Sequence, residues 1–388
     1  QFEGTGATIN SAGVGINGAT FAANGYTIQG STLTLGSPGG GPALTVNTGI
    51  SATISAPVGK AGGATNLRKE GAGTLSLTGS TVSVDRMYVN AGTLDFSGGT
   101  MTVSTGDFIV SNTTAAATYN QAAGTVNYGG NWLAIANNGV GTYTSTFNLS
   151  AGTFNANSSA LNMSVRANAT VNISGTGVLN VGAGLLTGHS TTTQVRTSTI
   201  NISGGTMNVT GGNIILSEGN SGTSTVINQT GGVFNYTGGG SLYIGNWGAA
   251  TQSISVSAGT FNAANTGVQY LAVRGNASLS VSGSANVSFK NLQVGHPSVG
   301  GTGTVHLDGG TLTLDSMGRN NGTGYFNFNG GTLLAAAGSG SFMSNLTRAN
   351  VRNGGAIIND QGYQITIAQA LLHSDLGGDA ATDGGLSK

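Results

Sequence analysis

The heptapeptide SAGTFNA occurs twice in this chain, at residues 150–156 and again at residues 257–263. Around each copy, apolar residues alternate with Thr, Ser and Asn, and Gly-rich turns separate these short runs. Strict alternation is typical of β-strands that bury one face. Two identical segments so far apart predict one structural position that a winding chain visits repeatedly.

A related unit, Gly-Thr followed by apolar, polar and apolar residues, recurs along most of the chain. Its Thr, or the residue in its place, stands at Thr74, Thr93, Thr125, Thr153, Val178, Thr206, Val233, Thr260, Thr311 and Thr332, with a degenerate copy near Ala285. The spacing averages about 26 residues, which is too short for a propeller blade of about 40–45 residues. The sequence therefore predicts an all-β fold, a right-handed parallel β-helix (β-solenoid) of roughly 14 coils.

Equivalent residues of successive coils are predicted to form columns. The first apolar position predicts an inward column of Leu75, Leu94, Val126, Phe154, Leu179, Met207, Phe234, Phe261, Leu312 and Leu333. The second predicts another of Leu77, Phe96, Tyr128, Ala156, Val181, Val209, Tyr236, Ala263 and Leu314. Because coils stack about 4.8 Å apart, the outward residues between them predict a hydrogen-bonded amide ladder. Its members are Asn127, Asn155, Asn180, Asn208, Asn235 and Asn262.

The segment LRKEGAGTLSLTG, at residues 67–79, resembles the defining segment of bacterial autotransporter-associated β-strand repeat proteins, also called passenger-associated transport repeats. Residues 354–388 resemble the stretch that leads into the next copy of that repeat. The resemblance implies a β-helical stalk, secreted or exposed at the surface of a diderm bacterium, and it implies no reaction. We expect one solenoid, with lead-in coils at 1–70, regular repeats at 71–335, and a coil and loop at 336–388 that lead to a next repeat or subunit.

The amino-acid composition limits the classes of ligand and partner that this chain can bind. The chain has 388 residues, 70 of them Gly, with 6% charged residues, no net formal charge and no Cys. Disulfides and thiolate metal sites are therefore excluded. The balanced charge argues against nucleic acid as a partner, and no apolar run of about 18 residues predicts a membrane-spanning helix.

Catalytic groupings are sparse in the sequence. Glycoside hydrolysis needs two carboxylates that face each other. Asp308 and Asp315 fall within one coil, where turn positions explain them equally well. A polysaccharide lyase needs acids for Ca²⁺ and a base, and Arg166 and Arg274 stand at matching places without an acid cluster. We expect these two Arg to cap turns or cover strand edges, and we expect no enzyme and no cofactor.

Two further groups of residues leave alternatives open. Asp375, Asp379 and Asp383, with His373, are either a Ca²⁺ site or solvated loop residues, although their spacing matches no known calcium loop. The four His residues, His189, His296, His306 and His373, show no metal-ligand spacing. Aromatic residues are either sugar-stacking or packing groups, and the candidates are Trp132, Trp247, Tyr243 and Tyr270.

Three functions follow as hypotheses. The first is a structural extracellular solenoid whose uncapped ends pair with further copies of the chain and build a filament, since an open strand edge templates pairing. The second is a surface adhesin or glycan-binding stalk, and the third is a polysaccharide-degrading enzyme on a β-helix.

Overall fold

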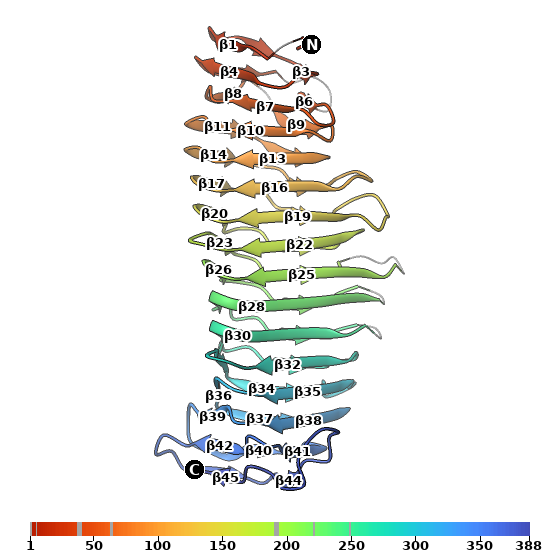
Figure 1. Cartoon of the computed structure of the whole chain (residues 1–388), viewed down its shortest axis with the longest axis vertical. Coiled ribbons are helices and arrows are strands. Elements are labelled where there is room, and N and C mark those ends of the chain that lie inside the picture. Colours follow the sequence, from red (N-terminus) through yellow and green to blue (C-terminus); the bar gives the residue numbers. More distant parts are fainter. Residues whose placement is uncertain are drawn as a thin grey trace. The chain divides into compact units, whose positions relative to one another are not determined.

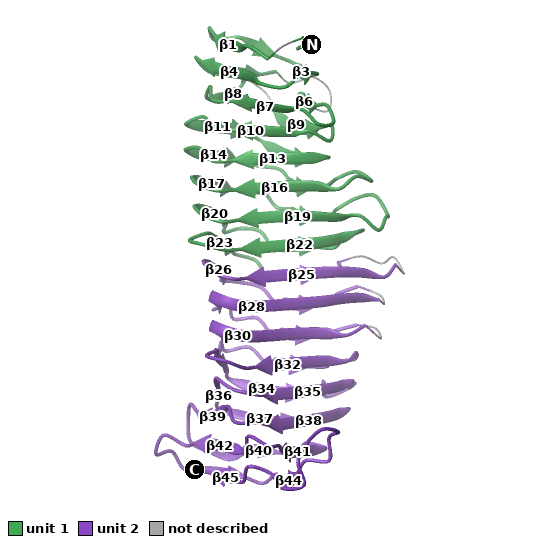
Figure 2. Cartoon of the chain, in the orientation of Figure 1, with its two compact units in different colours: residues 1–183 green, residues 184–388 purple. Residues whose placement is uncertain are grey.

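Three short strands, separated by tight turns, make up each turn of the chain. The computed structural model describes residues 2–4, 6–36, 41–62, 65–189, 194–219, 222–247 and 250–388. The chain is an all-β, parallel β-solenoid of about 14 turns that follow one another about 25 residues apart, which confirms the predicted fold class. It divides into two compact units, Gln1–Ala183 (unit 1) and Gly184–Lys388 (unit 2), coloured separately in Figure 2.

Within each unit the strands form three faces, which we number in the order that the chain reaches them (Figure 1). The first face of unit 1 contains β1 (Thr8–Ser11), β4 (Tyr26–Gly30), β7 (Ser51–Ile54), β10 (Thr74–Leu77), β13 (Gly92–Phe96), β16 (Ala117–Gln121), β19 (Thr144–Leu149) and β22 (Asn168–Ile173). Its second face contains β2 (Gly15–Ile16), β5 (Leu33–Leu35), β8 (Val58–Lys60), β11 (Thr81–Val84), β14 (Thr100–Val103), β17 (Thr125–Tyr128), β20 (Thr153–Ala156) and β23 (Val178–Val181). Its third face contains β3 (Gly18–Phe21), β6 (Ala43–Val46), β9 (Asn66–Glu70), β12 (Arg86–Val89), β15 (Phe108–Val110), β18 (Leu133–Ile135) and β21 (Leu161–Met163).

Unit 2 repeats this plan. Its first face contains β25 (Arg196–Ile202), β32 (Ala277–Val281), β35 (Thr302–Leu307), β38 (Thr323–Phe328), β41 (Arg348–Val351) and β44 (Leu371–His373). Its second face contains β26 (Thr206–Val209), β33 (Asn286–Phe289), β36 (Thr311–Leu314), β39 (Thr332–Ala335), β42 (Ala356–Asn359) and β45 (Leu386–Ser387). β28 (Thr223–Tyr236) and β30 (Gln252–Ala263) run through the corner and belong to both faces. The third face contains β24 (Leu185–Thr187), β27 (Ile214–Leu216), β29 (Leu242–Ile244), β31 (Gln269–Leu271), β34 (Asn291–Val294), β37 (Ser316–Arg319), β40 (Ser339–Ser344) and β43 (Ile365–Ile367).

The two copies of SAGTFNA occupy the same position, one in each unit. Phe154 and Phe261 lie inward on the second face and are almost completely buried. The glycine before each copy's Thr, Gly152 or Gly259, has a positive φ of 78° or 82°. A Cβ on Gly152 would lie 2.2 Å from a backbone oxygen of the preceding turn, and on Gly259 it would lie 2.4 Å from one. Only glycine fits this corner, because the backbones of successive turns approach too closely for a side chain.

The predicted inward residues are all buried, but the predicted columns are wrong at their start. Leu75 pairs with Leu94, and Leu94 with Tyr119, all on the first face. Val126 instead continues the second face, in register with Met101. For the same reason Leu77 and Phe96 do not belong with Tyr128.

The error arises because a Gly-Thr corner precedes strands of both faces. Thr93 begins the run on the first face, and Thr100 begins the equivalent run on the second face only seven residues later. Corrected for this, successive turns on the second face are 19, 25 and 28 residues apart, from Thr81 to Thr100, Thr125 and Thr153. The second-face strands that begin at these four residues are each four residues long, so segments outside them absorb the differences.

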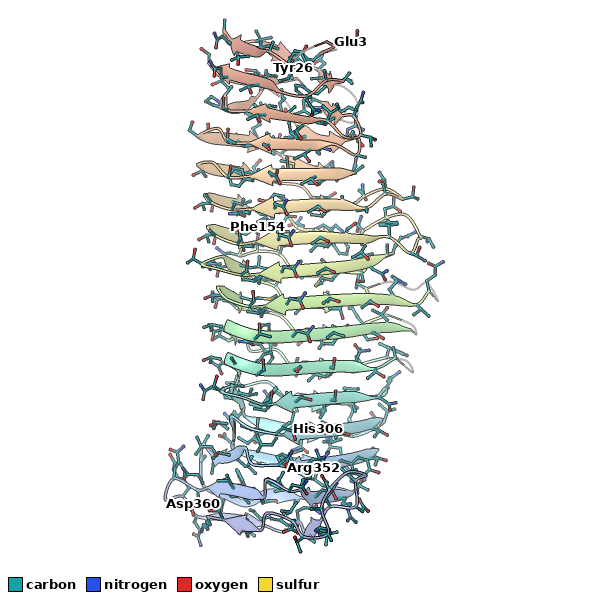
Figure 3. All side chains as sticks on the ribbon, viewed as in Figure 1. Glu3, Tyr26, Phe154, His306, Arg352 and Asp360 are labelled. Atoms are coloured by element: carbon teal, nitrogen blue, oxygen red, sulfur yellow. The ribbon has the colours of Figure 1, made fainter. Side chains whose placement is uncertain are left out.

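Unit 1 has an aromatic core centred on Phe154, whose position is labelled in Figure 3. The ring centre of Phe154 lies 5.0 Å from that of Phe108 and 5.2 Å from that of Phe147, both edge to face. Tyr119 lies 5.2 Å from Phe108 in the same geometry. In unit 2, Phe261 stacks flat on Phe234 at 4.5 Å. Ring contacts therefore contribute to the core of both units, edge to face in unit 1 and flat stacked in unit 2.

Candidate functional site

An amide ladder runs along the second face. In unit 1, Asn155 donates to Asn127 at 3.0 Å, and Asn180 donates to Asn155 at 2.8 Å. In unit 2, Asn235 donates to Asn208 at 3.0 Å. Asn262 stands opposite Asn235 in register, but its Oδ1 accepts from the Ser288 hydroxyl at 3.1 Å. The structure thus places all six predicted Asn residues in outward positions and bonds them as predicted between Asn127 and Asn155, between Asn155 and Asn180, and between Asn208 and Asn235.

A second ladder, which the sequence analysis missed, runs along the first face. In unit 1, Asn172 donates to Asn148, Asn148 to Asn120, and Asn120 to the Asp95 carboxylate, each at 2.7 Å. In unit 2, Asn228 donates to Asn201 at 3.1 Å. The signal is present in TYNQ, TFNL and TVNI, where Asn stands between two inward residues. These strands lack the Gly-Thr corner that defines the recurring unit, so the recurrence of that unit does not reveal them.

Trp132 is a packing residue of unit 1. Its half-buried ring packs with Tyr88 against a buried cluster of Ile109, Ala134 and Val165 on the outer side of the third face. Its indole N–H donates to the Asn137 side chain at 2.8 Å. Trp132 covers a patch of its own sheet, which matches the packing alternative for this residue.

The other three predicted aromatic residues lie on third-face strands of unit 2 or in the corners that follow them. We call this set the aromatic strip: Tyr243, Tyr270, His296, Trp247 and Arg274. Tyr243 and Tyr270 stack with ring centres 5.6 Å apart, and the His296 ring lies 5.1 Å from Tyr270. Arg274 places its guanidinium carbon 4.0 Å from the centre of the Trp247 ring. Trp247 is 37% exposed, so this strip presents aromatic surface to solvent.

Arg166 and Arg274 are equivalent in structure, as their sequence context predicts. Each is exposed, and each donates its backbone N–H to a residue of the preceding turn, Ala136 or Gly245, at 2.9 Å. Both acceptor residues have positive φ, 58° and 72°. The position is thus a corner of the third face, which agrees with a turn-covering role.

The acidic residues near the C-terminus are held in separate ion pairs. Asp379 accepts two hydrogen bonds of 2.9 Å from Arg352, and this contact lowers the pKa of Asp379. Asp375 lies 3.3 Å from Arg348, and Asp383 lies 3.1 Å from His373. Within the described ranges, no three His, Asp or Glu side chains converge on a metal position.

Asp308 and Asp315 do not face each other across a cleft. Asp308 accepts a hydrogen bond from Asn329 at 2.8 Å and lies 3.6 Å from Arg352. Asp315 follows β36, so a whole strand separates it from Asp308. The four His residues also have separate environments: His189 contacts Glu218, His296 stacks on Tyr270, His306 lies on β35 and His373 pairs with Asp383.

Two buried charges of unit 1 have structural partners. Lys69 lies inward on β9, fully buried, and its Nζ donates to the carbonyl oxygens of Glu70, Gly71 and Ala91 at 3.1, 2.7 and 2.9 Å. Burial lowers the pKa of Lys69 to about 8, although the Glu70 charge opposes this shift. Lys69 is the lysine of the segment that resembles the autotransporter-associated repeat.

Asp85 is the second buried charge. It accepts from the Lys60 ammonium at 2.5 Å, the Ser104 hydroxyl at 2.6 Å and the Thr65 backbone N–H at 2.8 Å. Burial alone would raise the pKa of Asp85, but these hydrogen bonds outweigh it and lower the pKa to about 2. The carboxylate thereby ties three segments of neighbouring turns together.

Comparison with known protein families, with curated proteins and with solved structures finds no match for this chain. Across the residues placed by the structure, no helix is long and apolar enough to cross a membrane.

Proposed function

We propose that this chain is a structural β-solenoid that assembles end to end into a filament or fibre at a bacterial surface. The observation that carries this proposal is the edge formed by β43, β44 and β45. Each of these strands pairs in parallel with one strand of the preceding turn, and we propose that a strand of a second copy pairs in the same way on its other side. A parallel edge of this kind accepts another strand.

Apolar side chains accompany the open edge. A cavity of about 150 Å³ is lined by Ile358, Ile365, Ile367, Leu386 and Lys388. Leu386 is 64% exposed, far more than the inward residues of other turns. The partner that fits is the first turn of a second copy, β1 to β3, because its strands have the same parallel direction. Phe2 already pairs with Phe21 of β3, so the contact displaces this residue or uses β1 and β2. Such a contact is heterologous, and it produces open filaments when the rotation does not close.

Other features support a structural role. The two amide ladders, the stacked rings and the buried Lys69 and Asp85 all join one turn to the next. The acidic residues Asp85 and Asp379 are committed to ion pairs that lower their pKa. The resemblance of residues 67–79 to autotransporter-associated repeats supports a place outside the cell.

Assembly can be tested with one edge variant and one matched control. We expect the purified chain to form fibres whose number grows with concentration, seen by electron microscopy and light scattering. Leu386→Asp puts a charge into the apolar edge, and we expect it to raise the concentration needed for assembly by at least about tenfold. Val195→Asp changes an apolar residue that is 81% exposed elsewhere, and we expect it to assemble as the unchanged chain does. A chain that stays monomeric at all concentrations would overturn the proposal.

The aromatic strip favours a second candidate function, adhesion to glycans. Stacked, partly exposed rings with a cation beside them suit the apolar faces of sugars. We expect Trp247→Ala or Tyr270→Ala to remove most binding on a glycan array. Tyr363→Ala changes an aromatic residue that is 45% exposed outside the strip, and we expect it to bind normally. An array without any bound glycan would remove this second function.

A further inference from the structure

A groove of about 540 Å³ opens on the first face of unit 2, near the C-terminus of the chain. Outward residues of β35, β38 and β41 form its floor, and residues 375–376 form one wall. The side chains that bear most of its polar groups are Thr304, His306, Tyr325, Thr347, Arg348 and Asp375. Figure 3 shows His306 in this region, with Arg352 on a nearby turn. Grooves of this size hold small ligands.

A directed chain of hydrogen bonds underlies the groove. Arg348 Nε donates to Asn350 Oδ1 at 2.5 Å, and Asn350 Nδ2 donates to Asn327 Oδ1 at 2.8 Å. Asn327 Nδ2 then faces His306 Nδ1 at 3.3 Å. A guanidinium can only donate, so it fixes the orientation of both amides. His306 Nδ1 must therefore accept, and the ring's proton lies on Nε2.

The side-chain amides of Asn327 and Asn350 are buried. Asn327 is 3% exposed and Asn350 is 2% exposed, although both occupy outward positions of the first face. The segment at residues 373–379, which contains the groove wall, is held in place by the Arg352–Asp379 pair and by a hydrogen bond of 2.8 Å from Arg348 to the His373 carbonyl. The groove floor is thus rigid before any ligand binds, which lowers the entropic cost of binding.

The charges of the groove balance. The Arg348 guanidinium lies 3.3 Å from the Asp375 carboxylate. Burial lowers the pKa of His306, so the imidazole is neutral at neutral pH. The opposite charges of the nearby Asp308 and Arg352 lie 3.6 Å apart and offset each other. The lining offers many donors and acceptors but no net charge, so it favours an uncharged polar ligand.

We propose that this groove binds a neutral saccharide. The adjacent Arg348 and Asp375 supply a donor and an acceptor for neighbouring sugar hydroxyls, and His306 Nε2–H supplies a fixed donor. The half-buried Tyr325 ring and the Leu376 side chain offer apolar surface for the C–H face of a pyranose. This site lies on another face than the aromatic strip and does not depend on filament assembly.

The test is a titration of the full chain with neutral and with uronate-containing oligosaccharides, followed by calorimetry. We expect neutral oligosaccharides to bind, and Tyr325→Ala and His306→Ala each to weaken binding by at least about tenfold. Ser278 and Ser280 stand one turn earlier, in register with Thr304 and His306 but outside the groove, so Ser278→Ala and Ser280→Ala are matched controls. We expect these controls to bind within about twofold of the unchanged chain. Circular dichroism and thermal unfolding establish that each variant is folded.

Two further variants test the charge preference of the groove and distinguish binding in the groove from binding at the aromatic strip. Asp375→Asn leaves the guanidinium uncompensated, and we expect it to shift the preference toward uronate-containing oligosaccharides. Tyr270→Ala alters only the aromatic strip, and we expect it to leave binding in the groove unchanged. The proposal is overturned if the folded chain binds no neutral saccharide, if uronates bind the unchanged chain more tightly, or if Tyr270→Ala removes binding while Tyr325→Ala does not.

Discussion

Replacing Phe154 by alanine is expected to lower the free energy of unfolding by about 4 kcal/mol. The side chain is fully buried, and it makes edge-to-face contacts with Phe108 and Phe147. Alanine leaves a cavity among rings that are fixed by strands of neighbouring turns, so the site collapses only partly. Each lost aromatic pair adds about 0.5–1.5 kcal/mol beyond the buried area. Urea unfolding followed by circular dichroism measures the loss.

Two controls make this result specific. Phe154→Leu keeps most of the volume, and we expect it to cost less than half as much. Phe261→Ala removes the equivalent ring of the second SAGTFNA copy, where the rings stack flat on Phe234 instead. A loss below about 1 kcal/mol for Phe154→Ala would contradict the packing described for unit 1.

Lys69→Met is expected to destabilise the chain by about 2–4 kcal/mol at pH 7. Methionine has a similar length and removes the cost of a buried charge. It also leaves the carbonyl oxygens of the half-buried residues Glu70, Gly71 and Ala91 without their donor, and an unsatisfied group costs about 1–3 kcal/mol where water does not reach it. Three orphaned acceptors outweigh the relief from the buried charge. Chemical unfolding at pH 7 measures the difference.

The pH dependence of stability provides an independent readout for Lys69. Its pKa is about 8 in the folded chain, whereas the ordinary lysine value of 10.5 applies to the unfolded chain. Between these values the unfolded state binds more protons, so stability rises with pH. We expect a gain of about 1.3 kcal/mol from pH 7 to pH 9, where Tyr residues of ordinary pKa are still mostly protonated. Lys69→Met lacks this gain, whereas Lys290→Met retains it. A flat profile in the unchanged chain would refute this account of Lys69.

The alternation of apolar and polar residues was sufficient to predict the fold class and the burial of residues such as Leu75 and Phe154. It also predicted the outward direction of Asn155 and its neighbours, because side chains in a strand alternate between two faces. The alternating pattern therefore predicts whether each side chain points inward or outward from its own strand. This property is local, so a single sequence is enough to predict it.

Alternation could not assign strands to faces. Thr93 and Thr100 begin similar runs, and only the hydrogen-bonded register shows that they belong to different columns. The groove could not be predicted from the sequence, because it depends on His306, Asn327 and Asn350 meeting across three turns. The internal position of Lys69 was missed for a related reason, since a lysine in a strand is normally assigned to the solvent side.

The glycine corners at Gly152 and Gly259 have an evolutionary consequence. Because these two corners precede equivalent strands of the second face, recombination between corners of that face adds or removes complete turns and leaves every later side chain on its original side. Loss of one residue within a strand instead inverts the remainder of that strand. The gene can therefore change in length by whole turns while the protein keeps its core, and natural variants of this chain are expected to differ mainly in turn number.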